Sequence, residues 1–221
     1  MITSNNFQNH SAYGSMIGDL KADQYWRIFR ISHEFTEGFE QLTNLPETVS
    51  IFGSARLPAD SYYYQTTVEL AERLSQQGFA IMSGGGPGIM EAANRGTHDV
   101  GAASIGLNMS LPHEQFPNPY MTPGLALRFH YFAMRKMHFA MRAKAIVAFP
   151  GGYGTLDEVF EVLTLCQTGK STKSRIILFD SHYWNGIINF DGLVQNGMIT
   201  EQDRDLVVMV ETAEEAWALI G

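Results

Sequence analysis

The order in which short apolar runs and helix-like segments follow one another is the feature that most narrows the folds open to this chain. Five apolar runs alternate with segments of helical pattern, and a weaker sixth follows; they are residues 49–53, 79–83, 103–107, 145–149, 175–179 and 206–210. They show little alternation of polar and apolar side chains, which is typical of parallel strands covered on both faces. The pattern predicts an α/β fold, a Rossmann-like doubly wound parallel sheet in three layers.

Glycine-rich segments follow the first, second and fourth runs, where parallel sheets bind ligands. They read FGSAR (52–56), SGGGPGIMEAANRG (83–96) and PGGYGT (150–155). If the strand order is 3-2-1-4-5, the first and last of these loops flank the crevice at which the order reverses. Glycine lets backbone N–H groups approach an anion, and the positive end of the following helix points to the same place. One such loop is as typical of a plain tight turn, but three together favour a phosphate site.

The N-terminal part of the chain divides into an arm and a helix. Residues 1–20 are rich in Ser, Asn and Gly and have no period, which predicts a mobile arm. From Asp23 to Leu42 apolar residues recur mostly at three- and four-residue steps, which predicts an extra N-terminal helix. We expect this helix to act as an oligomer contact or a lid. Residues 21–221 contain no linker and are expected to form a single Rossmann-like nucleotide-binding domain.

Charge, cysteine and histidine content narrow the class of protein. The formal net charge is −8, whereas proteins that bind nucleic acid or anionic membranes present basic faces. The single cysteine, Cys166, excludes an intramolecular disulfide, and the seven histidines show no metal-ligand spacing. A signal-peptide pattern and an apolar run of membrane-spanning length are both missing. We therefore expect a cytoplasmic protein without a metal site.

The pair Thr155-x-x-Glu158, after the third glycine-rich loop, has two interpretations. In a capping box, the Thr hydroxyl and the Glu carboxylate would satisfy backbone N–H groups at a helix start. Glu158 also stands beside the expected ligand crevice, where a carboxylate can do chemistry. Gln can replace Glu in a capping box but cannot act as a base, so the two interpretations are separable by experiment.

The segment FHYFAMRKMHFAMRAKA (129–145) predicts a largely buried helix that carries two cations. Arg135 and Lys136 fall on the same side of this helix as Phe132 and Phe139. A buried guanidinium needs an anion, because leaving it unpaired costs several kcal/mol. Either an internal acidic residue completes it, or a ligand phosphate or a catalytic carboxylate does.

With these residues in view, the chain resembles the LOG ("Lonely guy") family of nucleoside 5′-monophosphate phosphoribohydrolases, over about residues 49–197. The motifs that carry the resemblance are GGYGT (151–155) with Glu158, the pair Arg135-Lys136, and GGGPGIMEAANRG (84–96). The segments WRIFRISHEFTEGFE (26–40) and LTLCQTGK (163–170) are more similar to the longer bacterial branch than to the compact plant branch. That branch is associated with larger assemblies.

The resemblance implies that the chain hydrolyses the N-glycosidic bond of AMP-like or cytokinin riboside monophosphates, to free base and ribose 5-phosphate, without metal or cofactor. It implies Glu158 and Arg135 as the catalytic pair. Positive charge builds on the ribose as the base departs, and a carboxylate beside the sugar stabilises that state. The residues expected to bind the substrate and its phosphate are Gly53, Ser54, Gly84, Gly85, Gly86, Lys136, Gly151, Gly152, Gly154 and Thr155.

Two other functions stay open on the sequence. A nucleotide or cofactor carrier of Rossmann-like fold would use the same cradle without turnover, although it would not need Arg135 and Glu158 together. A lysine decarboxylase, as members of the family have often been labelled, would need a pyridoxal-phosphate lysine, and no lysine stands at the end of a predicted strand beside an obvious partner. Apolar surface beyond what one sheet face covers predicts a homo-oligomer, a dimer or larger, which binds neither nucleic acid nor membrane.

Overall fold

The computed structural model describes residues 10–110, 117–171 and 174–221, with only the backbone described for residues 10–22. Its strands are β1 (Thr48–Phe52), β2 (Ala80–Ser83), β3 (Ser104–Met109), β4 (Ala126–Phe129), β5 (Ala143–Ala148), β6 (Arg175–Phe179) and β7 (Val207–Val210). They form one sheet in the order β4-β3-β2-β1-β5-β6-β7, and each neighbouring pair is parallel. The predicted Rossmann-like parallel sheet is confirmed.

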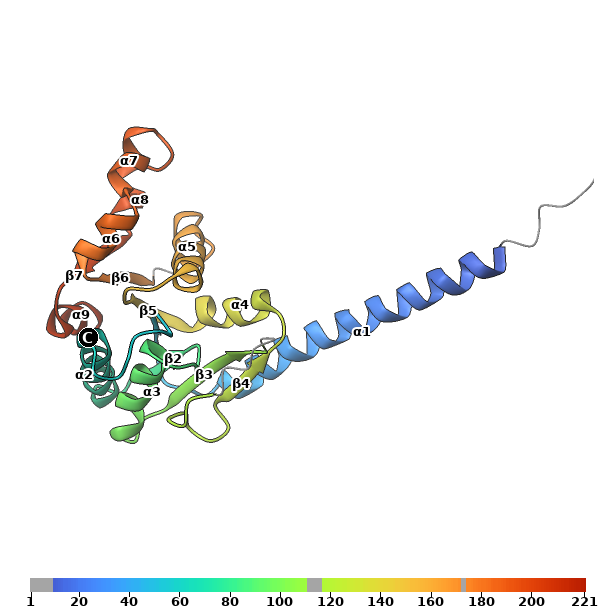
Figure 1. Ribbon diagram of the computed structural model, residues 1–221, viewed down its shortest axis with the longest axis horizontal. Coiled ribbons are helices and arrows are strands. Elements are labelled where there is room, and N and C mark those ends of the chain that lie inside the picture. Colours follow the sequence, from blue (N-terminus) through green and yellow to red (C-terminus); the bar gives the residue numbers. More distant parts are fainter. Residues whose placement is uncertain (1–9, 111–116, 172–173) are drawn as a thin grey trace, which may run out of the picture.

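Helices cover both faces of this sheet, which makes three layers (Figure 1). The helices on one face are α2 (Tyr62–Gln76), α3 (Ile89–Asp99) and α9 (Ala213–Ile220). Those on the other face are α1 (His10–Leu42), α4 (Phe132–Arg142), α5 (Tyr153–Gln167), α6 (Ser181–Ile187) and α7 (Phe190–Gln195). The short helix α8 (Glu201–Arg204) leads into β7. Each face of the sheet packs on its helices in a hydrophobic core, and successive strand residues alternate between the two cores. Ile51 packs with the first set of helices and Phe52 with the second.

The strand order places the ligand crevice where the sequence predicted it. The expected order 3-2-1-4-5 corresponds to β3-β2-β1-β5-β6 and is confirmed. At the ends of β1 and β5, the Phe149 N–H donates to the Phe52 carbonyl at 2.8 Å, and the Ser54 N–H donates to the Pro150 carbonyl at 3.0 Å. The first and third glycine-rich loops therefore lie side by side at the point where strand order reverses.

One strand was missed, and the buried helix was predicted too long. Residues 126–129 form β4 at the edge of the sheet, with alternating exposed and buried side chains. Phe129 therefore belongs to a strand and not to the helix expected over 129–145. At the other end of α4, Ala143 already begins β5. The apolar residues at both ends of this segment are buried in the sheet rather than around a helix.

The N-terminal helix begins earlier than predicted. Helix α1 starts at His10, so residues 10–20, expected as an arm without periodic structure, are helical; residues 1–9 lie outside the described part. Its C-terminal part packs on α4: the Glu34 carboxylate accepts the backbone N–H of His130 at 3.0 Å and that of Tyr131 at 3.4 Å. A Cβ at Gly38 would lie 2.2 Å from His138 Nε2, so only glycine permits this helix contact. The rest of α1 projects away from the sheet (Figure 1).

Candidate active site

A cavity of about 710 Å³ opens at the carboxyl ends of β1 and β5, beneath α4 and beside the start of α5. The residues around it come from the three glycine-rich loops, α4, α5, α6 and the end of β3. They are Phe52, Gly53, Ser54, Ala55, Arg56, Gly84, Met90, Asn108, Met109, Phe132, Arg135, Phe139, Gly151, Gly152, Tyr153, Gly154, Thr155, Leu156, Glu158, Tyr183 and Ile187. One small molecule of nucleotide size fits such a volume.

Arg135 and Glu158 form an ion pair in the wall of this cavity. Arg135 Nη2 lies 2.7 Å from Glu158 Oε1, and the two side chains are only 13% and 6% exposed. The guanidinium lies over the rings of Phe132 and Phe139, at 5.2 and 5.8 Å from their centroids. Its Nε is buried without a hydrogen-bond partner among the described residues. The cation is thus fixed by one carboxylate and two aromatic faces.

The environment of Glu158 pulls its pKa in two directions. Burial raises the pKa of the carboxyl, while the charges of Arg135 and Lys136 lower it, and the net shift is upward from the ordinary value. A carboxyl group that is poised in this way in a cavity is typical of acid–base and charge-stabilising sites.

The capping-box interpretation of Thr155 and Glu158 is wrong. Helix α5 begins at Tyr153 and its N-cap is Gly152, so Thr155 stands inside the first turn and not at the cap. The hydroxyl of Thr155 lies against Gly151, where an added Cβ would be 2.2 Å from Thr155 Oγ1. Glu158 stands in the second turn, and its carboxylate accepts from Arg135 rather than closing a reciprocal cap. Its position serves the cavity and not the helix start.

The structure brings most of the predicted ligand-binding glycines together. Gly53, Ser54, Gly84, Gly151, Gly152, Gly154 and Thr155 all line the cavity. Gly85 and Gly86 do not, because their loop turns toward the protein interior. The Gly85 N–H donates to Ser83 Oγ at 3.0 Å, and its carbonyl accepts the Asn118 N–H at 2.9 Å. Gly85 has φ +68°, so it serves the turn itself rather than the ligand.

Lys136 also lies outside the cavity lining, although it follows Arg135 directly. Its Nζ is 2.7 Å from Asp157 Oδ1 and 2.9 Å from Glu161 Oε2, both on α5. The lysine therefore ties α4 to α5 through two carboxylates of α5. For the buried guanidinium of Arg135, the anion is the internal carboxylate of Glu158, which is also the candidate catalytic carboxylate.

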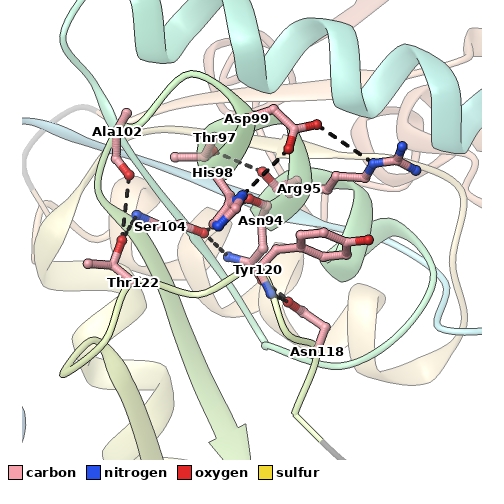
Figure 2. Close-up of polar contacts among 11 residues, drawn as sticks. Asn94, Arg95, Thr97, His98, Asp99, Ala102, Ser104, Asn118, Tyr120 and Thr122 are labelled. Atoms are coloured by element: carbon pink, nitrogen blue, oxygen red, sulfur yellow. Dashed lines mark hydrogen bonds and ion pairs between the residues drawn. The ribbon is translucent and has the colours of Figure 1, made fainter.

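A buried polar network holds the second glycine-rich loop in place. Asn94 Nδ2 donates to Ser104 Oγ at 2.9 Å, and Asn118 Nδ2 donates to Asn94 Oδ1 at 2.9 Å (Figure 2). The same amide of Asn118 donates to the Gly86 carbonyl at 3.1 Å. Thr122 Oγ1 accepts the Ser104 N–H at 3.0 Å, again visible in Figure 2. The segment around Asn118 and Thr122 is thereby fixed to α3, β3 and the loop.

Several lining residues were missed by the sequence interpretation. Asn108 stands near the end of β3, Tyr183 follows the end of β6, and Phe132 opens α4. The first two stand at or just after the carboxyl ends of strands, which is the signal that could have identified them. Among the described residues, no cluster of three or more His, Cys, Asp or Glu side chains could hold a metal ion. Nor does any helix among the described residues have the length and hydropathy to cross a membrane.

Fold and site together define the class of protein. An open parallel sheet with glycine-rich turns and a helix N-terminus around one cavity at its switch point is typical of Rossmann-like proteins that bind a small phosphorylated ligand. The family described as "Possible lysine decarboxylase" matches residues 90–220.

Two curated plant proteins identify that family further. The chain is 30% identical over 171 residues to the cytokinin riboside 5′-monophosphate phosphoribohydrolases LOG3 and LOG4 of Arabidopsis thaliana, over 76% of this chain and 78% of each relative. The chain therefore belongs to the LOG family, as its motifs indicated.

A solved structure shows the same fold. The molybdenum cofactor binding protein from the phototrophic bacterium Rippkaea orientalis superposes with a TM-score of 0.59, over 80% of this chain and 96% of that one. The sequences are 17% identical, so the likeness concerns the fold alone.

Proposed function

We propose that this chain is a hydrolase that cleaves the N-glycosidic bond of nucleoside 5′-monophosphates, releasing the free base and ribose 5-phosphate. AMP-like nucleotides and cytokinin riboside monophosphates are the substrate class. The observation that carries the proposal is the buried Glu158 carboxylate, which lines the cavity next to the start of α5 and is paired with Arg135 at 2.7 Å. Named relatives with this activity support it.

The start of α5 is the place for the 5′-phosphate. The first N–H groups of a helix have no acceptor within the helix, and the helix dipole adds positive charge there. Gly152, Gly154 and Thr155 stand at this end and line the cavity. Glu158 is one turn from Gly154, about 6 Å along the axis. That span is comparable to the reach from a 5′-phosphate to the anomeric carbon, so a phosphate at the helix start places the ribose beside Glu158.

Glu158 and Arg135 then act at the anomeric carbon. The bond between C1′ and the base nitrogen breaks with its electron pair leaving on the base, and the ribose gains positive charge. The Glu158 carboxylate stabilises this charge and orients or deprotonates the water that attacks C1′; overall, water gives its hydroxyl to the ribose and a proton to the base. Burial raises the pKa of Glu158, Arg135 lowers it in part, and the hydrogen bond from Arg135 holds the carboxylate in place.

The two other functions, a cofactor carrier and a lysine decarboxylase, explain fewer features of the site. A cofactor carrier needs the glycine-rich cradle, and it gives no reason for a buried carboxylate paired with arginine in the cavity. A pyridoxal-phosphate decarboxylase needs a lysine in the cavity wall. None of the lysines whose side chains the structure describes lines the cavity, and Lys136 is held by Asp157 and Glu161.

We also propose that the protein works as a symmetric homo-oligomer, at least a dimer. Tyr25, Trp26, Ile28 and Phe29 on the projecting part of α1 are 59–70% exposed. An apolar cluster of this kind on a helix that extends from the sheet is typical of a contact between subunits. The cytoplasmic location expected from the sequence stays a prediction.

The test of the function is a chromatographic assay of purified protein with AMP and with adenosine. We expect adenine and ribose 5-phosphate from AMP, and far slower release of adenine from adenosine, because adenosine lacks the phosphate that orients the ribose. Equal rates on the two substrates would contradict the idea that a phosphate bound at the start of α5 orients the ribose. Binding of AMP without any release of adenine would favour the carrier.

A further inference from the structure

A chain of hydrogen bonds behind the cavity reaches the glycine-rich turn that precedes α5. Tyr183 of α6 lines the cavity, and its hydroxyl donates to the Gly151 carbonyl at 2.6 Å. The backbone N–H of Tyr183 donates to Asp180 Oδ1 at 3.1 Å. The other oxygen of Asp180 accepts the Tyr63 hydroxyl at 2.5 Å. Segments from α2, the end of β6 and the start of α6 thus support one turn of the candidate site.

Asp180 holds Tyr183 at a fixed position. It is the one non-glycine residue of positive φ among the described residues, at φ +76°, and it caps α6. Such a backbone conformation persists only where surrounding contacts determine it. Burial raises the pKa of Asp180, but the bonds from Tyr63 and Tyr183 outweigh it and the pKa falls below its ordinary value. The carboxylate therefore stays ionised at neutral pH and keeps both bonds.

The bond from Tyr183 sets the orientation of one peptide unit. In a trans peptide the C=O and the following N–H point in opposite directions, so holding the Gly151 carbonyl also directs the Gly152 N–H. The Pro150 carbonyl is held in the same way by the Ser54 N–H at 3.0 Å. Two carbonyl oxygens that would repel an anion are thus occupied by protein donors. The Gly152 N–H finds no acceptor among the described residues, and a Cβ at Gly152 would meet open space.

We propose that Tyr183 is a positioning residue for the substrate phosphate: its hydroxyl holds the Gly151–Gly152 peptide so that the Gly152 N–H donates to the phosphate oxygen. The inference rests on the proposed function, since it concerns the phosphate of the same substrate. It assigns to Tyr183 no contact with the sugar or the base, and it leaves the chemistry to Glu158 and Arg135.

The test compares Tyr183→Phe with wild type and with Tyr62→Phe as a matched control. Tyr62 loses the same group, but its exposed hydroxyl bonds the Glu211 carbonyl and lies outside the cavity lining. One neutral hydrogen bond corresponds to about 3- to 10-fold in affinity. For Tyr183→Phe we expect KM for AMP to rise about 3- to 10-fold with kcat little changed. The slow reaction of adenosine should be unchanged, and Tyr62→Phe should match wild type throughout.

A second measurement does not depend on turnover. Inorganic phosphate, titrated calorimetrically, should bind Tyr183→Phe about 3- to 10-fold more weakly than wild type and Tyr62→Phe. An unchanged phosphate affinity with an unchanged KM would overturn the inference while leaving the proposed function intact. A parallel fall in the AMP and adenosine rates would also overturn it, because loss of general support for the fold affects both substrates. If wild type releases no adenine, the proposed function fails and the phosphate titration still decides the role of Tyr183.

Discussion

Replacing Glu158 with Gln removes one charge and keeps the size and shape of the side chain, so it separates the effect on chemistry from the effect on folding. Two terms of opposite sign determine the change in stability. Arg135 loses its counter-charge, and an unpaired buried charge costs about 3–5 kcal/mol. The Gln amide oxygen still accepts from Arg135 Nη2, which recovers part of that cost.

The second term favours the variant. The pKa of Glu158 is raised in the folded protein because burial outweighs Arg135 and Lys136, so the ionised carboxylate is less favourable there than in the unfolded chain. Each unit of such a pKa shift corresponds to about 1.4 kcal/mol, and the neutral Gln side chain does not have this cost. With the two terms opposed, we expect the free energy of unfolding of Glu158→Gln to lie within about 1 kcal/mol of wild type at neutral pH.

The sign of the pH dependence follows from the same shift. A group with a raised folded pKa stabilises the fold below its unfolded pKa, and that contribution is lost as pH rises through the folded pKa. Wild type should therefore lose stability relative to Glu158→Gln as pH rises from acid to neutral. Urea unfolding of both proteins across this range measures the difference, in which the other titrating groups largely cancel.

The effect on turnover should be far larger. Loss of the carboxylate should lower AMP hydrolysis at least ~100-fold, the lower range for acid–base groups, while AMP binding persists. Glu161→Gln is the matched control, since it makes the same change on α5 at a side chain that pairs with Lys136 and lies outside the cavity lining. It should retain turnover close to wild type. If Glu158→Gln hydrolyses AMP at a near-normal rate, Glu158 does not act at the chemical step and our mechanism is wrong.

Two further predictions concern the ion pair and the assembly. Because Arg135 lowers the pKa of Glu158, Arg135→Gln should move the acid limb of the kcat/KM profile to higher pH; an unshifted limb would show that Arg135 does not control this charge. Static light scattering at micromolar concentration should give a multiple of the 24.7 kDa chain mass. The double variant Trp26→Ser/Phe29→Ser should reduce that mass while each subunit stays folded by circular dichroism, because the two side chains are 69% and 68% exposed in the single subunit; a monomer mass for wild type would refute the assembly.

The fold was predictable because its buried strands are short apolar runs that alternate with helices. The prediction was wrong in segments whose residue types do not distinguish a strand from a helix, or a helix from a loop. Residues 126–129 are as apolar as the start of a helix, and only their pairing with β3 at the sheet edge makes them β4. Likewise residues 10–20 lack an apolar period, and yet they are the first turns of α1.

The candidate site was predictable to the extent that one strand end or one helix carries it. Arg135, Glu158 and the glycines after β1 and β5 could be named because each follows from a local pattern of charge or turn residues. The position of Lys136 outside the cavity could not be predicted, because it depends on contacts with Asp157 and Glu161 of another helix. The pattern T-x-x-E is identical in sequence whether its Thr is at the N-cap or inside the first turn.

The residue at which α5 begins decides whether Thr155 is the N-cap or stands inside the first turn. Contacts from elsewhere in the chain support the observed start. The Pro150 and Gly151 carbonyls are held by Ser54 after β1 and by Tyr183 of α6, which keeps Gly152 extended as the N-cap. Starting the helix at Tyr153 moves Thr155 off the cap and turns Glu158 toward Arg135. The catalytic assignment of Glu158 therefore depends on the same two contacts that orient the predicted phosphate donors. A variant that shifted this helix start would be expected to affect phosphate binding and the Glu158–Arg135 pair together.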